Sequence, residues 1–165
     1  MVNQPIHTST IAEIMTKPVA TVTPSDSILH AVSVMVDKEI GCVVVLQGKP
    51  VGILTERDIL KQIRKGIDFM HVPVKEVMSK PVVTIASTDD PLKALSIMTN
   101  RKIRRLPVVE REQLVGIVTE RDLVRWILIH PEVIATLLSE SSFPVLSKEL
   151  IVAFFTNIGP ERGLR

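Results

Sequence analysis

Aromatic residues are nearly absent from this chain of 165 residues, where they make up 3% and include no tyrosine. Hydrophobic residues nevertheless make up 45%, so we expect a globular protein whose core is built from Val, Ile, Leu, Ala and Met. There is a single cysteine, Cys42, which excludes an intrachain disulfide and is typical of a reducing compartment.

Long apolar runs are also missing. No stretch reaches the roughly 20 apolar residues of a membrane span, and residues 1–14 have neither the basic nor the apolar region of a signal peptide. The formal net charge is +2, which permits anionic ligands without requiring a nucleic acid. We therefore expect a cytoplasmic protein made of one domain or two small ones.

Signatures of catalysis are absent as well. The histidines His7, His30, His71 and His130 show neither metal-ligand spacing nor the pattern of a catalytic triad. There is no Gly-x-Gly-x-x-Gly or Walker motif. Cys42 lies in an apolar run, where an unreactive core thiol is expected. The sequence therefore favours a binding or regulatory protein over an enzyme, with no metal site.

An internal repeat is the main positive feature. Glu-Ile-Met-Thr-Lys-Pro-Val at 13–19 returns as Glu-Val-Met-Ser-Lys-Pro-Val at 76–82. Gly-Ile-Leu-Thr-Glu-Arg-Asp at 52–58 returns as Gly-Ile-Val-Thr-Glu-Arg-Asp at 116–122, with one extra residue entering the second copy near Arg111. The two halves are therefore duplicated units of one fold.

Each copy predicts the element order β-α-β-β-α. Apolar β-branched runs predict strands covered on both faces, and turn residues between two such runs predict a hairpin. Helices are expected after Ser/Thr-Asp pairs that can act as N-caps and after the hairpins. The expected strands are 19–22, 42–46 and 51–54, then 82–85, 106–109 and 115–118; the expected helices follow Ser25-Asp26 and Thr88-Asp89 and cover 56–64 and 120–129.

The repeat ends near residue 130. We expect units over 10–66 and 74–130, followed by a helical extension over 131–165. Residues 150–155 (Leu-Ile-Val-Ala-Phe-Phe) are apolar on every side, so we expect them to be buried against the core or a partner subunit. Within this extension the predicted helices are 132–139 and 147–157.

A Thr-x-x-Asp motif stands in both copies where a strand ends and a helix begins. One interpretation is a helix cap, because Thr and Asp at this spacing nearly form a capping box. The other is a ligand site, because a helix N-terminus attracts phosphate and an Asp can accept from both ribose hydroxyls. Arg57 and Arg121, on the same turns, can contact phosphates.

The duplication, the element order and the two Gly-Ile-x-Thr-Glu-Arg-Asp segments resemble a pair of CBS domains, also called a Bateman module, over residues 10–129. The resemblance implies an α+β fold whose two domains pack through their sheets around a pseudo-twofold axis and leave two clefts. It implies an adenine nucleotide (AMP, ADP or ATP) or a related adenosine compound as regulatory ligand. It also implies a homodimer. Since we expect no fused catalytic domain, the regulated target would be a separate protein or would be absent altogether.

The resemblance also implies roles by position. Asp58 and Asp122 would bind the ribose hydroxyls, and Thr55 and Thr119 would contact sugar or phosphate. Four further segments would meet the adenine or reach the phosphates: Thr21 and Val22; Thr84 and Ile85; Ile40, Gly41, Cys42 and Val43; and Ile103, Arg104, Arg105, Leu106 and Pro107.

The copies differ where Gly41-Cys42 of the first corresponds to Arg104-Arg105 of the second. We therefore expect unequal affinities at the two clefts, with Arg105 near phosphate. Two other functions stay open. One is nucleic-acid binding by the basic run 101–105, which the lack of stacking aromatics disfavours. The other is a purely structural dimerisation module, which the intact Thr-x-x-Asp motifs disfavour.

Overall fold

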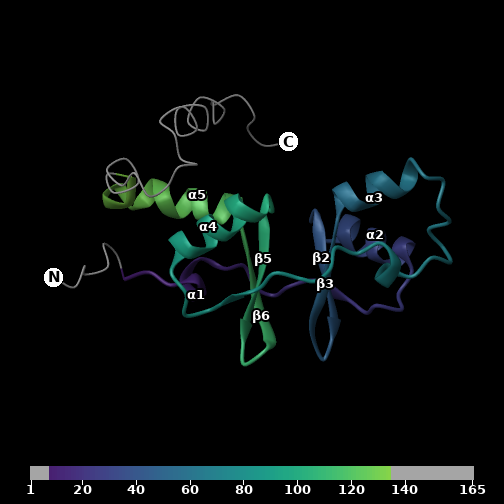
Figure 1. Cartoon of the computed structure of the whole chain (residues 1–165), viewed down its shortest axis with the longest axis horizontal. Helices are drawn as coiled ribbons and strands as arrows, with labels where there is room; N and C mark the ends of the chain where they lie inside the picture. Colours follow the sequence, from purple (N-terminus) through teal and green to yellow (C-terminus); the bar gives the residue numbers. More distant parts are fainter. Residues whose placement is uncertain (1–7, 135–165) are drawn as a thin grey trace.

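Two halves of the same design lie side by side in the structure (Figure 1). This computed structural model describes residues 8–134. The predicted order β-α-β-β-α and the α+β class are confirmed in both halves. The first half consists of β1 (Thr21–Val22), α2 (Ile28–Asp37), β2 (Cys42–Gln47), β3 (Lys49–Thr55) and α3 (Glu56–Ile63). The second consists of β4 (Ile85–Ala86), α4 (Pro91–Arg101), β5 (Arg105–Glu110), β6 (Gln113–Thr119) and α5 (Glu120–Ile129).

Each half is built on a three-stranded sheet, in the order β1-β2-β3 or β4-β5-β6. The first strand runs parallel to the second, and the second and third form an antiparallel hairpin. The middle of β2, from Val43 to Val45, is at most 1% exposed, which confirms a strand covered on both faces. The two hairpins stand next to each other at the centre of Figure 1, with the helices of each half on its outer side.

The starts of the first helices were predicted two residues too early. Ser27 caps α2 and Asp90 caps α4. Asp26 and Asp89, which we expected to belong to the caps, instead close the turns that precede the helices. Each carboxylate accepts a backbone N–H from three residues earlier in the chain, at 2.6 and 3.0 Å respectively. An acidic side chain just before a helix can cap the helix or close the preceding turn, and in both halves it closes the turn.

The opening strands are shorter than predicted. Thr21 and Val22 pair with Val44 and Val45 of β2, and the predicted residues 19 and 20 lie outside β1, although the Ala20 carbonyl still accepts from the Val44 N–H at 3.1 Å. In the second half the pairing likewise begins only at β4, three residues later than predicted. In both halves the segment that follows the proline therefore runs along the junction between the halves rather than within a sheet.

The opening segments of the two halves are exchanged. Helix α1 (Ile11–Ile14) packs on the second half, where Ile11 is fully buried and its N–H donates to the carbonyl of Asp89 at 2.9 Å. The 3-10 helix η1 (Val74–Glu76) packs on the first half, where Val74 is fully buried and its N–H donates to the carbonyl of Asp26 at 2.8 Å. Two backbone bridges complete the exchange: Thr16 with Ile117 and Ile53 with Ser79.

A methionine in each exchanged segment covers a glycine of the other half. Met15 lies on Gly116, and Met78 lies on Gly52. At either glycine, a Cβ would overlap the methionine sulfur. The repeated Met and Gly of the two sequence motifs are therefore partners across the junction, because only a glycine lets the methionine approach so closely.

The extra residue of the second copy lies in the β5–β6 turn, as predicted. Arg111 and Glu112 occupy this turn with φ of 47° and 67°, whereas Gly48 alone turns the first hairpin. Two consecutive left-handed residues are typical of a two-residue hairpin turn. Lys49 and Glu112 form an ion pair of 2.7 Å between the tips of the two hairpins.

The described part of the chain ends just after α5. Residues 131–134 are helical, as expected for the start of the helix predicted at 132–139, and Val133 packs against Trp126. The rest of that helix, the helix predicted at 147–157 and the apolar segment 150–155 lie outside the described residues. None of the helices within residues 8–134 has the length and apolar character that crossing a bilayer requires.

The contact between Met15 and Gly116 generates a first prediction. Gly116→Ala should lower the free energy of unfolding by about 1–3 kcal/mol, since the added methyl group overpacks a tight contact. Urea denaturation measures this loss. In a Met15→Ala background the same Gly116→Ala change should cost almost nothing, and an undiminished cost there would show that the methionine contact is not its cause.

Candidate functional site

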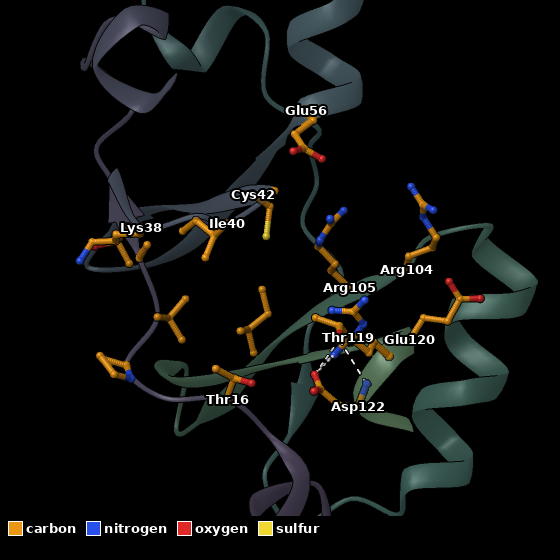
Figure 2. A pocket seen from close by; sticks show the side chains of 17 residues that line it. Thr16, Lys38, Ile40, Cys42, Glu56, Arg104, Arg105, Thr119, Glu120 and Asp122 are labelled. Carbon is orange, nitrogen blue, oxygen red and sulfur yellow. Dashed lines mark hydrogen bonds between the residues drawn. The ribbon is translucent and has the colours of Figure 1, made fainter. Parts of the chain in front are cut away.

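A cleft of about 1080 Å³ lies between the halves, and we call it the large cleft. Figure 2 shows Ile40 and Cys42 of the first half opposite Thr119 and Asp122 of the second, with Arg105 beside the gap. Its full lining comes from both halves: Thr16, Pro18, Val19, Ala20, Thr21, Lys38, Ile40, Gly41, Cys42 and Glu56, with Arg104, Arg105, Ile117, Thr119, Glu120, Arg121 and Asp122.

A second cleft, which we call the small cleft, is the counterpart of the first under the internal repeat. Its volume is about 250 Å³. The Thr-x-x-Asp motif at its wall is that of the first half, and the opposing segments belong to the second. Its lining is Ile53, Thr55, Glu56, Arg57, Asp58 and Lys61, with Ser79, Pro81, Val82, Val83, Lys102, Ile103, Arg104, Arg105 and Pro107.

Each cleft therefore combines the helix start of one half with the post-proline segment of the other. In the large cleft, the start of α5 faces residues 18–21, and in the small cleft the start of α3 faces residues 81–83. This pairing follows from the exchange of the opening segments, since residues 16–21 return from the second half to their own sheet along the junction.

The helix-cap interpretation of both Thr-x-x-Asp motifs is confirmed. Thr119 donates to Asp122 Oδ2 from its backbone N–H (2.9 Å) and from its hydroxyl (2.7 Å), while the Asp122 N–H donates to Thr119 Oγ1 at 3.3 Å. Thr55 and Asp58 make the same three bonds at 3.1, 2.6 and 3.3 Å. The cap does not exclude the ligand interpretation, because it uses only one oxygen of each carboxylate.

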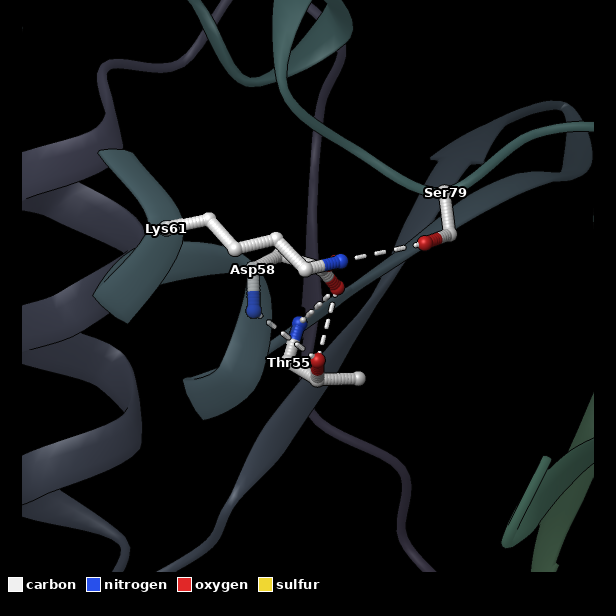
Figure 3. Close-up of polar contacts among 4 residues, drawn as sticks. All are labelled: Thr55, Asp58, Lys61 and Ser79. Atoms are coloured by element: carbon white, nitrogen blue, oxygen red, sulfur yellow. Dashed lines mark hydrogen bonds and ion pairs between the residues drawn. The ribbon is translucent and has the colours of Figure 1, made fainter. Parts of the chain in front are cut away.

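The second oxygen distinguishes the two motifs. Asp58 Oδ1 accepts long contacts from Ser79 Oγ (3.4 Å) and Lys61 Nζ (3.5 Å), and the residue is 7% exposed (Figure 3). Asp122 Oδ1 accepts no hydrogen bond from residues 8–134, and Asp122 lines the large cleft. Within the described residues, the carboxylate oxygen without a donor therefore belongs to Asp122, whereas Asp58 Oδ1 has two donors at long distance.

Arg104, Arg105 and Glu56 line both clefts and so form a shared wall between them. Gly41 makes this crowding possible, because a Cβ there would lie 2.8 Å from both Arg105 Nη2 and Glu56 Oε2. The two positions that differ between the copies are 41 against 104 and 42 against 105. They therefore place basic side chains at this shared wall from the second half only.

Cys42 lies on the wall of the large cleft and is half-buried. Burial raises the pKa of its thiol; the positive charge of Arg105 opposes this shift and the negative charge of Glu56 adds to it. The thiol therefore stays protonated near neutral pH, which agrees with the expected weak reactivity.

The structure brings most of the residues named from sequence to the clefts and leaves five of them elsewhere. Thr21, Ile40, Gly41, Cys42, Thr119, Arg121 and Asp122 line the large cleft; Thr55, Arg57, Asp58, Ile103 and Pro107 line the small one; Arg104 and Arg105 line both. Val22, Val43, Ile85 and Leu106 are buried in the two cores, and Thr84 lines neither cleft.

Strand alternation explains most of these five residues. Successive side chains of a strand point to opposite faces, so Val22 and Val43 face the core when their neighbours Thr21 and Cys42 face the cleft. Sequence reasoning also missed charged residues of the lining, notably Glu56 and Glu120. Both belong to the repeated Thr-Glu-Arg-Asp segment, which was the available signal.

Comparisons with known proteins agree with this architecture. The family model described as "CBS domain" matches residues 11–65 and again 74–129. The CBS domain-containing protein YhcV of Bacillus subtilis is 41% identical over 117 residues, which cover 70% of this chain and 83% of YhcV. The chain spans smaller shares of other curated relatives, for example 67% of one and 31% of another, both described as uncharacterized.

Two solved structures share the fold. One is the CBS domain protein PAE2072 from Pyrobaculum aerophilum complexed with AMP, with a TM-score of 0.68 and 25% identity, covering 73% of this chain and 96% of that one. The other is the CBS domain pair of protein MJ0100 in complex with 5-methylthioadenosine and S-adenosyl-L-methionine, with a TM-score of 0.66 and 27% identity, covering 73% and 97%. The duplicated sequence, the two equivalent sheets and these matches show that the chain belongs to the CBS-domain family, as a tandem pair of CBS domains.

Proposed function

We propose that this CBS pair is a regulatory module that binds an adenosine-type ligand in the large cleft. The observation that carries the proposal is the Asp122 carboxylate: the residue lines the cleft, its cap fixes Oδ2, and none of residues 8–134 donates to Oδ1. The AMP bound to PAE2072 and the adenosine compounds bound to MJ0100 support the same ligand class.

The cleft offers a partner for each part of such a ligand. The vacant Asp122 oxygen can accept from a ribose hydroxyl. Arg105 and Arg121 supply charge for a phosphate, and the start of α5 adds the positive end of a helix dipole. Apolar side chains on the opposite wall, including Val19 and Ile40, can cover an adenine ring. The cleft volume is comparable to the roughly 300–1,000 Å³ of small-molecule sites.

Regulation would follow from the position of the ligand between the halves. A bound nucleotide touches walls that belong to both halves, so ligands of different size or charge favour different angles between them. The outer helices would carry this change to a second copy of the chain or to a separate target protein. Such an output requires no catalytic group.

The nucleic-acid alternative receives less support. Of the basic run 101–105, Arg104 and Arg105 line the clefts instead of extending one flat basic face. The dimerisation alternative does not explain why both Thr-x-x-Asp motifs border clefts. Neither alternative predicts that the two Asp positions differ in their effect on nucleotide binding.

Calorimetric titration with AMP, ADP, ATP and S-adenosylmethionine tests the function. Asp122→Asn should weaken binding of the preferred ligand by roughly 10- to 100-fold, the cost of losing a charge-assisted contact. Asn retains an oxygen for the Thr119 cap, and thermal unfolding checks that the fold is kept. The matched control is Asp58→Asn, which should have a much smaller effect.

Equal losses in these two variants would contradict the assignment to the large cleft. Absence of heat with all four ligands, from folded protein verified free of carried-over nucleotide, would contradict the ligand-binding function itself. In that case salt-dependent binding to nucleic acid becomes the next experiment.

Cys42 provides an independent probe of the same cleft. As the single cysteine, it should react with iodoacetamide more slowly than a free thiol at pH 8, because burial raises its pKa. The bound ligand should slow the reaction further by covering the wall on which Cys42 lies. Mass spectrometry over time measures both rates, and a ligand that binds without protecting Cys42 would place the site elsewhere.

A further inference from the structure

Glu56 and Arg105 bring opposite charges together at Gly41, on the wall of the large cleft. A Cβ at Gly41 would lie 2.8 Å from Glu56 Oε2 and 2.8 Å from Arg105 Nη2, so both charged groups lie against the same backbone atom. Figure 2 shows the Arg105 side chain extending from the second half towards the Glu56 carboxylate. Both charges reach the same neighbour: beyond the effect of burial, Arg105 lowers the pKa of the Cys42 thiol and Glu56 raises it.

Neither of these two charges is taken up by an ion pair. Among residues 8–134, no group forms a salt bridge with Glu56 or with Arg105. The Glu56 side chain is also exposed. Both charges can therefore act on a charged ligand in the large cleft, and they act in opposite directions.

The charges that line the large cleft nearly cancel, so a single carboxylate has weight there. The lining has four basic side chains and three acidic ones, namely Lys38, Arg104, Arg105 and Arg121 with Glu56, Glu120 and Asp122. Loss of one carboxylate would therefore double the net positive charge of the lining. With Asp122 assigned to the ribose hydroxyls, Glu56 and Glu120 remain as the carboxylates that can act on a charged 5′ substituent.

We propose that Glu56 determines the charge preference of the large cleft for its adenosine-type ligand. The inference rests on the proposed function and deepens it. A 5′-phosphate drawn towards Arg105 is repelled by Glu56, whereas the positive sulfonium group of S-adenosylmethionine is attracted by it. Glu56 thus shifts the choice away from anionic adenosine ligands and towards cationic ones.

Glu120 is the matched position for a control. Glu56 and Glu120 are the first residues of α3 and α5, where an acidic side chain also stabilises the helix N-terminus, and both line the large cleft. Under the internal repeat, the pair of Glu56 and Arg105 corresponds to Glu120 and Cys42, and Cys42 carries no positive charge. A merely structural role would thus be the same for both glutamates, whereas a role in charge preference belongs to Glu56.

Calorimetric titration with three adenosine ligands of different charge tests the inference: AMP, methylthioadenosine and S-adenosylmethionine. Methylthioadenosine has no charge at its 5′ end and is the reference. Relative to it, Glu56→Gln should strengthen AMP binding by roughly three- to tenfold and weaken S-adenosylmethionine binding by a similar factor. Both shifts should shrink in about 0.5 M salt, because ions screen exposed charges. Glu120→Gln should change the AMP-to-S-adenosylmethionine affinity ratio much less.

Equal shifts of that ratio in the two glutamine variants would overturn the inference, since total charge rather than Glu56 would then set the preference. The same affinity loss for all three ligands in Glu56→Gln would indicate a structural role and also overturn it. A ratio that Glu56→Gln leaves unchanged, while Asp122→Asn weakens every ligand, would overturn this inference and leave the proposed function intact. Absence of binding of all three ligands to the wild-type protein would overturn both proposals together.

Discussion

The exchange of opening segments between the halves is the constraint on which the clefts depend. Ile11 completes the core of the second half and Val74 that of the first, and each is fully buried. Burial of such a side chain contributes about 1.5–3 kcal/mol, so neither half keeps its full core without the other. After each exchange the chain must return to its own sheet, and residues 18–21 and 81–83 on these return paths form cleft walls.

The duplication gives two halves with the same backbone arrangement, and a few side chains make their clefts chemically different. The backbone at the start of α3 matches that at the start of α5, since the Glu56 N–H donates to the carbonyl of Gly41 (3.2 Å) and the Glu120 N–H to that of Arg104 (3.0 Å). Gly41 leaves room that Arg105 and Glu56 occupy. Both basic residues of the shared wall thus come from the second half, and they line the large cleft as well as the small one.

Much of the fold was predictable from the sequence, because each helix and strand could be predicted separately in both copies of the repeat. The element order and the extra turn residue near Arg111 could be predicted from hydrophobic pattern and offset. The site was predictable by residue type but not by pairing: the sequence does not say which opening segment lies against Thr55 and Asp58, and the structure places residues 81–83 there. Which side chains of a strand face the core, as Val22 and Leu106 do, depends on packing that a short apolar run does not specify.

The same exchange limits what a ligand can do to the molecule. Since α1 and η1 already join the two cores, a bound nucleotide has no need to assemble the halves and cannot separate them without exposing Ile11 or Val74. In the proposed function ligands change the angle between the halves, and the backbone bridges at Thr16 and Ser79 lie at the junction where such a rotation would occur. A ligand shifts such an equilibrium only by its difference in affinity for the two angles. Charges that reach across the junction, as Arg105 does towards Glu56, are the groups best placed to create that difference.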